Sequence, residues 1–560
     1  MKKFSEFPVR VPNFKKAIEK INAFTEQIKN AKSENEIFKI LRQQDRFSEA
    51  LQTDFSIINV RYTLNVNDPF IIKAITKIDE ESPYLAEPSQ NFVRAILASP
   101  YLPAISKKYT EYFVTILRNS LLTSSPAVIS EMIELNKLSS QYSAIVGSAK
   151  IEFRGETYNL SQMRKFTSDP NREIRREASF ASASWYSVHN VELGEIYDKM
   201  VKLRHQKAIK LGFKSFTELG YISLGRTDYS AEDVRVYREQ IKNEAVPLAT
   251  KLINAQRRRI GLSHMYFYDT GYHFLDGNPI PNGTPDQLIE KAHEMYTEMG
   301  PITGDFFDLL RDNELLDVIS RPGKVPGGYM TQFPKYKVPF VFANFNGTQG
   351  DVEVLTHEYG HAFQYYLSRN IKPTDFISPT LESCEIHSMS MEFIAWPWMS
   401  KFFDDVRKFK ISHLEGAITF LPYGALVDDF QHHVYAHPEM THVERLAKWR
   451  ELEKQYMPYQ DYEKCEFLEE GGYWLRQGHI FENPFYYIDY TLAQVIAFQF
   501  LVESQKDWNK AWRKYLKLCK MGGKYPFTSL LKHAHLRVPF EEGSLEKTFR
   551  PLKQILKNIS

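Results

Sequence analysis

The segment from Asp351 to Gln364, DVEVLTHEYGHAFQ, constrains the fold most, because its chemistry works only on a helix. Residues four apart lie on one helix face about one turn apart, so His357 and His361 can direct two imidazoles at one ion. Glu358 lies beside them and points partly toward the same centre. This His-Glu-x-x-His pattern supplies two neutral nitrogens for zinc and a carboxylate that can take a proton from an activated water.

The surrounding residues favour the helix that this pattern needs. Apolar side chains recur at helical spacing from Val352 to Leu367, and no proline interrupts residues 353–369. The alternative is a buried helix whose two histidines form hydrogen bonds inside the core. A zinc helix is the stronger hypothesis, because the motif and its helical context occur together.

A catalytic zinc needs a third protein ligand, and the next segment supplies candidates. Ser378 and Pro379 predict the start of another helix, as an N-cap followed by proline at the first helical position. Spacing alone leaves Glu382 and Glu385 tied as the third ligand, since both share one broad helix face. Cys384 points away from the helix face that carries these two glutamates. The polar set on this helix also includes His387 and Glu392.

These motifs resemble the zinc oligopeptidase family of thimet oligopeptidase and neurolysin, and most closely its bacterial member oligoendopeptidase F. In that family the third ligand is a glutamate about two dozen residues after the second histidine, and another glutamate follows two turns later. Glu385 and Glu392 fit this pair, whereas Glu382 does not. The resemblance therefore implies one zinc ion held by His357, His361 and Glu385, with Glu392 orienting a ligand histidine.

A strand is predicted before the zinc helix, from Val338 to Phe345, with a turn at Gly347. A strand beside a metal site can hold an extended peptide by backbone hydrogen bonds. The alternative is a buried strand that contacts no ligand. The segment resembles the substrate-aligning strand of oligoendopeptidase F, which implies a substrate-binding set of Phe342, Ala343, Asn344, Gly347 and Thr348.

A second candidate catalytic stretch runs from Gly478 to Gln494. Amide hydrolysis passes through an oxyanion that a phenol or an imidazole can stabilise. In a chain with 32 tyrosines, such a cluster is usually packing. The resemblance instead implies that Tyr490 is the principal oxyanion donor and that His479 assists it, with Tyr486 or Tyr487 as the supporting phenol.

A rival metal group lies farther along the chain. Asp429, His433 and His437 follow one another at four-residue spacing, with His432 alongside, and such a line can bind zinc. It lacks a glutamate placed as a general base, so we expect a helix that lines the interior instead.

The length of the chain predicts more than one lobe. The 560 residues exceed what one core usually serves, so we predict an N-terminal helical lobe over 1–150 and a zinc-peptidase catalytic region over 151–560. The predicted fold class is mainly α, with a small β-sheet next to the zinc helix. The resemblance implies a large two-lobed molecule with a deep substrate channel.

The net charge and the cysteines indicate which partners and which cell compartment to expect. A net charge of +2 gives no basic patch for nucleic acid, and the three cysteines show no disulfide spacing. The first residues lack the apolar stretch of a signal peptide, and no apolar run is long enough to span a membrane. We therefore expect a cytoplasmic protein with short peptides as partners and neither nucleic acid nor membrane.

Together these observations predict a zinc metallo-endopeptidase that hydrolyses internal bonds of short oligopeptides. Glu358 is the predicted general base, and zinc with Tyr490 would stabilise the oxyanion. Two alternatives stay open. One is a zinc carboxypeptidase with the same ligands, and the other is a non-catalytic, zinc-containing peptide-binding scaffold.

Overall fold

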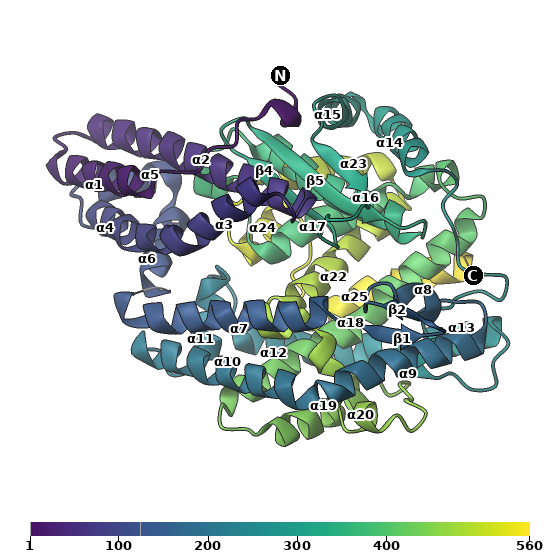
Figure 1. The fold of residues 1–560 in the computed structure, drawn as a ribbon. Coiled ribbons are helices and arrows are strands. Elements are labelled where there is room, and N and C mark those ends of the chain that lie inside the picture. Colours follow the sequence, from purple (N-terminus) through teal and green to yellow (C-terminus); the bar gives the residue numbers. More distant parts are fainter. Residues whose placement is uncertain (1, 124, 560) are drawn as a thin grey trace.

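The computed structural model describes residues 2–123 and 125–559 and is predominantly helical (Figure 1). The predicted fold class, mainly α with a small sheet beside the motif helix, is confirmed. Nowhere in the described ranges is a helix long and apolar enough to cross a membrane.

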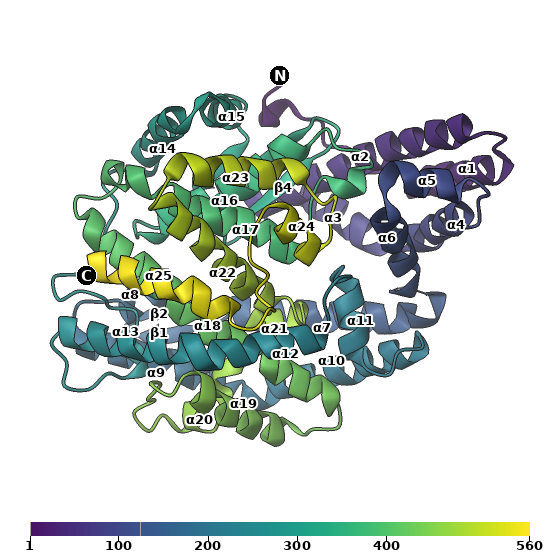
Figure 2. The same ribbon diagram turned by 180° about the vertical axis from the view of Figure 1, so that it is seen from behind.

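All the N-terminal helices but the last project at one side of the molecule in both views, and the last one lies in the lower layer (Figures 1 and 2). They are α1 (Phe14–Asn30), α2 (Glu34–Leu64), α3 (Pro69–Glu81), α4 (Ala86–Leu97), α5 (Leu102–Tyr109), α6 (Glu111–Leu122) and α7 (Ile129–Gly147). A separate apolar core joins α1, α2, α4, α5 and α6, and Phe376 from the later chain closes it. The boundary at residue 150 stays a prediction, because α2 also packs on the sheet that precedes the motif helix.

A hairpin and eight helices follow. The hairpin forms from β1 (Ile151–Phe153) and β2 (Glu156–Tyr158), and Arg154 and Gly155 turn it with φ of 52° and 86°. The helices are α8 (Arg164–Thr167), α9 (Arg172–Val188), α10 (Asn190–Lys210), α11 (Phe216–Ser223), α12 (Ala231–Gln240), α13 (Val246–Arg259), α14 (Pro285–Met299) and α15 (Pro301–Asp312).

A three-stranded sheet precedes the motif helix. Its order is β3 (Leu316–Ile319), β5 (Val338–Phe345) and β4 (Tyr329–Phe333), so β5 lies in the centre and β4 at an edge. β5 pairs parallel with β3 and antiparallel with β4, where Tyr329 lies opposite Phe342. The bounds of β5 match the predicted strand, because its near-continuous apolar sequence suits a strand buried on both faces.

The remaining helices contribute to the large central core, together with the three-stranded sheet and several earlier helices. They are α16 (Gly350–Ser368), α17 (Leu381–Ile394), α18 (Val406–Ala436), α19 (His442–Tyr456), α20 (Glu466–Glu469), α21 (Gly478–Glu482), α22 (Tyr487–Ser504), α23 (Trp508–Met521), α24 (Phe527–His533) and α25 (Ser544–Ile559). α22 is buried along most of its length and packs on both α17 and α18. The sheet and α16 lie on one side of α22, and α18 with the lower helices lies on the other (Figures 1 and 2).

Candidate metal centre and active site

The three predicted ligands converge on one point between α16 and α17. His357 Nε2 lies 3.2 Å from Glu385 Oε2, and His361 Nε2 lies 3.4 Å from the same oxygen. Ligand atoms about 2.0–2.2 Å from a tetrahedral ion stand about 3.3–3.6 Å apart. The two distances are close to the edges of such a site, so the donor set is suited to a metal ion. Within residues 2–123 and 125–559, these residues form the one group with metal-binding spacing.

Gly360 allows the two helices to approach closely enough for this convergence. A Cβ atom at Gly360 would lie 2.6 Å from the carbonyl oxygen of His387 and 2.7 Å from Ser388 Cα. Any side chain there would push α17 away from α16, and Glu385 would move away from the two imidazoles with it. The glycine inside the motif is therefore a requirement of packing.

Of Glu382 and Glu385, only Glu385 lies in the group whose spacing suits a metal. Glu382 lies in the first turn, is fully buried and accepts a hydrogen bond from Thr380 Oγ1 at 2.9 Å, outside the ligand group. The predicted helix start at Ser378–Pro379 is wrong. The backbone N–H groups of Ser383 and Cys384 bond to the carbonyl of Thr380, so α17 begins at Leu381.

A hydrogen-bonded chain behind the ligands fixes the tautomer of His357. Trp396 Nε1–H donates to His413 Nδ1 at 3.0 Å, which leaves the His413 proton on Nε2 for Glu392 Oε2 at 2.8 Å. The other oxygen, Glu392 Oε1, accepts from His357 Nδ1 at 2.7 Å. The lone pair of His357 Nε2 therefore faces the ligand group, as metal binding requires. The sequence predicts that Glu392 orients a ligand histidine, and the structure places it against His357. His413 and Trp396 were not identified from the sequence.

Replacing His413 should weaken metal binding without removing a ligand. In His413→Phe, Glu392 loses a donor and Trp396 loses its acceptor, so His357 is less firmly oriented. We expect a fall in metal affinity of about 10- to 100-fold, measured by competition with a chelator. His437→Phe is a matched control, because His437 is an exposed histidine just after the same helix. A folded His413→Phe with wild-type affinity would contradict this role.

Glu358 lies against the ligands but is not one of them. Its side chain is buried, and within the described residues its Oε2 atom has no hydrogen-bond partner. Burial raises the pKa of Glu358, and the two histidines act in the opposite direction. A Cβ placed on Gly328, just before β4, would lie 3.6 Å from Glu358 Oε1, so the chain leading into the edge strand passes beside this carboxylate. A buried carboxylate oxygen left unpaired beside a metal site is suited to accept a proton.

Tyr486 contacts the third ligand directly. Its hydroxyl donates to Glu385 Oε1 at 2.8 Å, and Ser388 Oγ donates to Glu385 Oε2 at 3.1 Å. These bonds hold the Glu385 carboxylate in place. Burial is the first cause that raises the pKa of Tyr486, and the Glu385 charge adds to it, so this phenol remains a donor.

His479 is oriented by residues that the sequence analysis did not identify. Tyr423 donates to Gln477 Oε1 at 2.9 Å, and Gln477 Nε2 donates to His479 Nδ1 at 2.8 Å. The imidazole proton therefore lies on Nε2, which is available as a donor. Burial lowers the pKa of His479, so it is neutral at neutral pH. Its ring centroid lies 5.0 Å from that of Tyr487 and 5.8 Å from that of Tyr490.

The predicted substrate-binding set lies in and after β5. Phe342 and Ala343 are buried in the central strand, and both edges of Phe342 face other strands. Asn344 Nδ2 donates to the carbonyls of Val325 and Gly327, so this side chain fastens the loop beside Glu358. The set as a whole, which also includes Gly347 and Thr348, stays a prediction. The edge strand β4 is the part of the sheet that sequence reasoning did not select.

The rival metal group does not assemble. Asp429 accepts a hydrogen bond from Tyr456 at 2.8 Å and faces Arg238 at 3.4 Å. His437 is exposed and lies 3.4 Å from Glu439. Asp429 thus has protein partners of its own, and His433 and His437 do not form a metal-binding group with it within the described residues. His387, the other candidate on α17, is fully buried against Tyr515.

Two cavities share lining residues in the segment from Gly478 to Gln494. One, of about 500 Å³, is lined by His413, Glu392 and Tyr490, and it also contacts His479 and Tyr487. The other, of about 850 Å³, is lined by His479 and Tyr487 together with Gln477 and Tyr423. His479 and Tyr487 therefore stand between two spaces, each of the size that small-molecule sites have.

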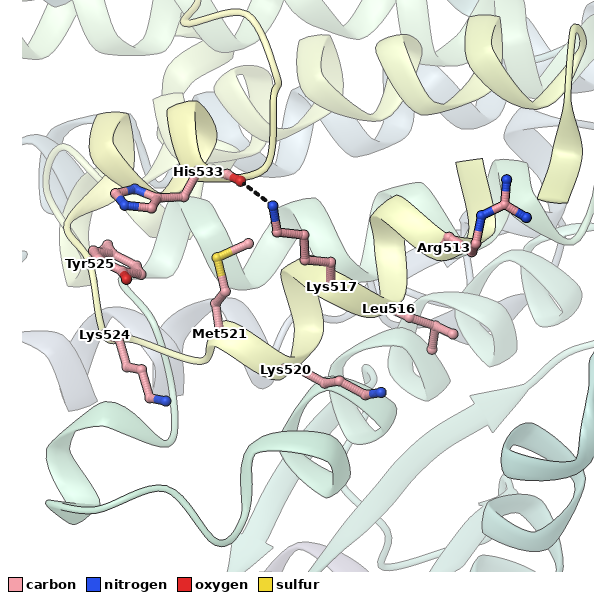
Figure 3. A pocket seen from close by; sticks show the side chains of 8 residues that line it. All are labelled: Arg513, Leu516, Lys517, Lys520, Met521, Lys524, Tyr525 and His533. Carbon is pink, nitrogen blue, oxygen red and sulfur yellow. Dashed lines mark hydrogen bonds between the residues drawn. The ribbon is translucent and has the colours of Figure 1, made fainter. Parts of the chain in front are cut away.

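A separate basic pocket lies between α23 and α24 (Figure 3). Arg513, Lys517 and Lys520 of α23 line it, together with Lys524 from the loop that follows, and Lys517 Nζ donates to the carbonyl of His533 at 2.8 Å. It has a volume of about 570 Å³ and includes none of the metal ligands. We assign no catalytic role to it.

Comparison with known proteins identifies the family. The sequence model of Peptidase family M3 matches residues 165–280 and 286–549, and that of the Peptidase M3 N-terminal domain matches residues 4–124. The chain belongs to Peptidase family M3. All the candidate metal and catalytic residues lie in the second M3 segment.

Individual M3 relatives agree with this assignment. PZ peptidase A, solved with an inhibitor, superposes with a TM-score of 0.95 at 42% identity over 99% of each chain. A Bacillus anthracis structure provisionally assigned to oligoendopeptidase F superposes with a TM-score of 0.91 at 38% identity, over 100% of this chain and 98% of that chain. Oligopeptidase PepF of Bacillus subtilis is 22% identical over 72% of this chain, which spans only 62% of that protein. The predicted kinship with oligoendopeptidase F is confirmed.

Proposed function

We propose that this chain is a zinc-dependent oligoendopeptidase that cuts internal bonds of short peptides. One observation carries the proposal: two imidazole nitrogens and one carboxylate oxygen converge, with the unpaired carboxylate oxygen of Glu358 beside them. His357, His361 and Glu385 would hold one zinc ion. Membership of Peptidase family M3 supports the reaction class, and the proposed setting is cytoplasmic.

When bound, zinc supplies a Lewis acid that activates water and polarises the scissile carbonyl. Glu358 accepts the proton that the attacking water loses and passes it to the departing amine. Its raised pKa brings the carboxylate closer to neutral pH, where accepting and releasing a proton are both favourable. Its unpaired oxygen leaves room for the proton.

Tyr490 and His479 would donate to the oxyanion that forms on the attacked carbonyl. His479 is neutral with its proton on Nε2, and burial raises the pKa of Tyr490, so both groups keep a proton to share. Donors fixed in advance stabilise developing charge more than mobile water does. Tyr486 would act through Glu385, and Tyr487 would pack beside His479.

The peptide backbone would lie along the free edge of the sheet. β4 is the edge strand, and Gly328 brings the chain that enters it close to Glu358. An extended peptide can pair with such an edge and present its scissile bond to the metal. Asn344 would support this edge from behind, through its bonds to the loop.

The test is cleavage of end-blocked, quenched fluorescent peptides, with metal content measured on the same protein. We expect one zinc per chain, internal cleavage, loss of activity with a chelator and recovery on adding zinc. Release of a single residue from unblocked peptides alone would indicate a carboxypeptidase. Bound zinc with no hydrolysis of any peptide would favour a peptide-binding scaffold and would contradict the proposal.

A further inference from the structure

The turn that leads into α22 contains a residue in a strained backbone conformation. Phe485 has φ of 66°, in the left-handed region that a bulky side chain rarely adopts. Its ring is fully buried and packs on Gly220 of α11, where an added Cβ would lie 2.9 Å from it. Phe485 directly precedes Tyr486, the N-cap of α22. Strain of this kind persists only where the surrounding structure enforces it, and it concentrates at functional sites.

Both backbone groups of Phe485 are held by buried side chains from other parts of the chain. Its N–H donates to Gln431 Oε1 at 2.9 Å, and its carbonyl accepts from Arg226 Nη2 at 2.6 Å. The same arginine nitrogen donates to Asp489 Oδ1 at 2.6 Å. Because Asp489 directly precedes Tyr490, one guanidinium joins the strained turn to the first turn of α22.

Arg226 is itself fixed by local contacts. It lies between α11 and α12, its N–H donates to the carbonyl of Tyr221 at 3.1 Å, and its guanidinium lies 4.4 Å from the centre of the Tyr221 ring. The side chains of Arg226 and Asp489 are both fully buried. A buried ion pair is weak evidence for stability, because apolar residues of similar shape often replace one without loss. The structure that this pair holds in place therefore matters more than its contribution to stability.

We propose that Arg226 is a positioning residue for catalysis, which acts through the turn at Phe485 and through Asp489 to place the phenols of Tyr486 and Tyr490. This inference rests on the proposed peptidase function. Tyr490 would donate to the oxyanion, and Tyr486 bonds the Glu385 carboxylate, so a shift of the turn would act on both groups. Arg226 lines neither of the two cavities beside His479, so its effect has to pass through the phenols.

The test replaces the ion pair as a unit, because removal of one partner alone would leave a buried charge unpaired. Methionine and leucine are close in shape to the two side chains, so Arg226→Met/Asp489→Leu should fold. At saturating zinc we expect kcat to fall by about 10- to 100-fold, the effect of a small misplacement of a reacting group, with little change in KM. Metal affinity, measured by competition with a chelator, should also fall, because Tyr486 loses its position against Glu385.

Gln431→Met is a second variant that reaches the same turn from α18 without removing a charge. It deletes the acceptor of the Phe485 N–H, so the turn is held by Arg226 alone. We expect a smaller fall in kcat of the same kind, again with little change in KM. Wild-type kcat and metal affinity in both folded variants would overturn the positioning role.

A double-mutant cycle separates positioning from general damage to the fold. If the ion pair acts through the Tyr490 phenol, its replacement should cost little more kcat once Tyr490→Phe has removed that phenol. Damage elsewhere in the molecule would instead multiply with the loss caused by Tyr490→Phe. Full multiplication of the two losses would therefore overturn the proposal.

Arg175→Met is the matched control. Arg175 is also a buried arginine that donates both to a backbone carbonyl, that of Asp169 at 2.7 Å, and to an aspartate, Asp269 at 3.0 Å. Asp269 keeps Arg172 as a partner in this variant. Folded Arg175→Met should keep the wild-type kcat and metal affinity. If wild type cuts no peptide, the proposed function fails, whereas a fall in metal affinity in Arg226→Met/Asp489→Leu but not in this control would still support the positioning role.

Discussion

Glu358→Gln should bind zinc as wild type does and lose about 10²- to 10⁴-fold in kcat, the usual range for a general base. The change preserves shape and removes the carboxylate that accepts the proton. His357, His361 and Glu385 do not depend on Glu358 for their contacts, so the metal site should survive. Metal content by mass spectrometry and turnover on an end-blocked peptide measure the two effects separately.

Glu353→Gln is the matched control for this variant. Glu353 lies on the same helix, and burial raises the pKa of its carboxyl also. Its Oε1 atom accepts a hydrogen bond from Gln349 Nε2 at 2.8 Å, and it does not belong to the metal-binding group. We expect near wild-type turnover from it. Turnover of zinc-loaded Glu358→Gln equal to that of this control would exclude Glu358 as the base.

The sequence predicted those parts of the site that depend on local periodicity. His357, Glu358 and His361 share a helix face by the four-residue repeat, and α16 places them so. The third ligand was not determined by spacing, because Glu382 and Glu385 share a face. The choice depends on where α17 crosses α16, which Gly360 controls through a contact with another helix.

Other parts of the site depend on contacts between distant segments. His413 lies 21 residues beyond Glu392 on another helix, and no pattern in its own neighbourhood identifies it as a partner of His357. β5 was predicted with its observed bounds from composition, yet its central position follows from pairing with β3 and β4. Strand order is a non-local property, so the edge strand beside Glu358 could be found only in the folded chain.

The tyrosines illustrate the same limit, because a cluster in sequence does not assign a role to each phenol. Tyr486 and Tyr490 are one helical turn apart with ring centroids 5.0 Å apart. In the fold the two side chains interact with each other, but their other contacts differ. The Tyr486 hydroxyl bonds Glu385, whereas Tyr490 lines the cavity with His479. This difference predicts two distinct phenotypes.

Tyr490→Phe should lower kcat by about 10²- to 10³-fold, as loss of one oxyanion donor does, with little change in KM or metal affinity. The phenol acts only when charge develops on the carbonyl oxygen, so substrate binding does not depend on it. Tyr486→Phe is the matched comparison. It removes the bond to Glu385 Oε1, so it should weaken metal affinity, and excess zinc should restore most of its activity. Chelator competition and kinetics at saturating zinc distinguish the two. If Tyr486→Phe keeps its metal and loses kcat while Tyr490→Phe stays active, the oxyanion donor is Tyr486 and the assignment to Tyr490 is wrong.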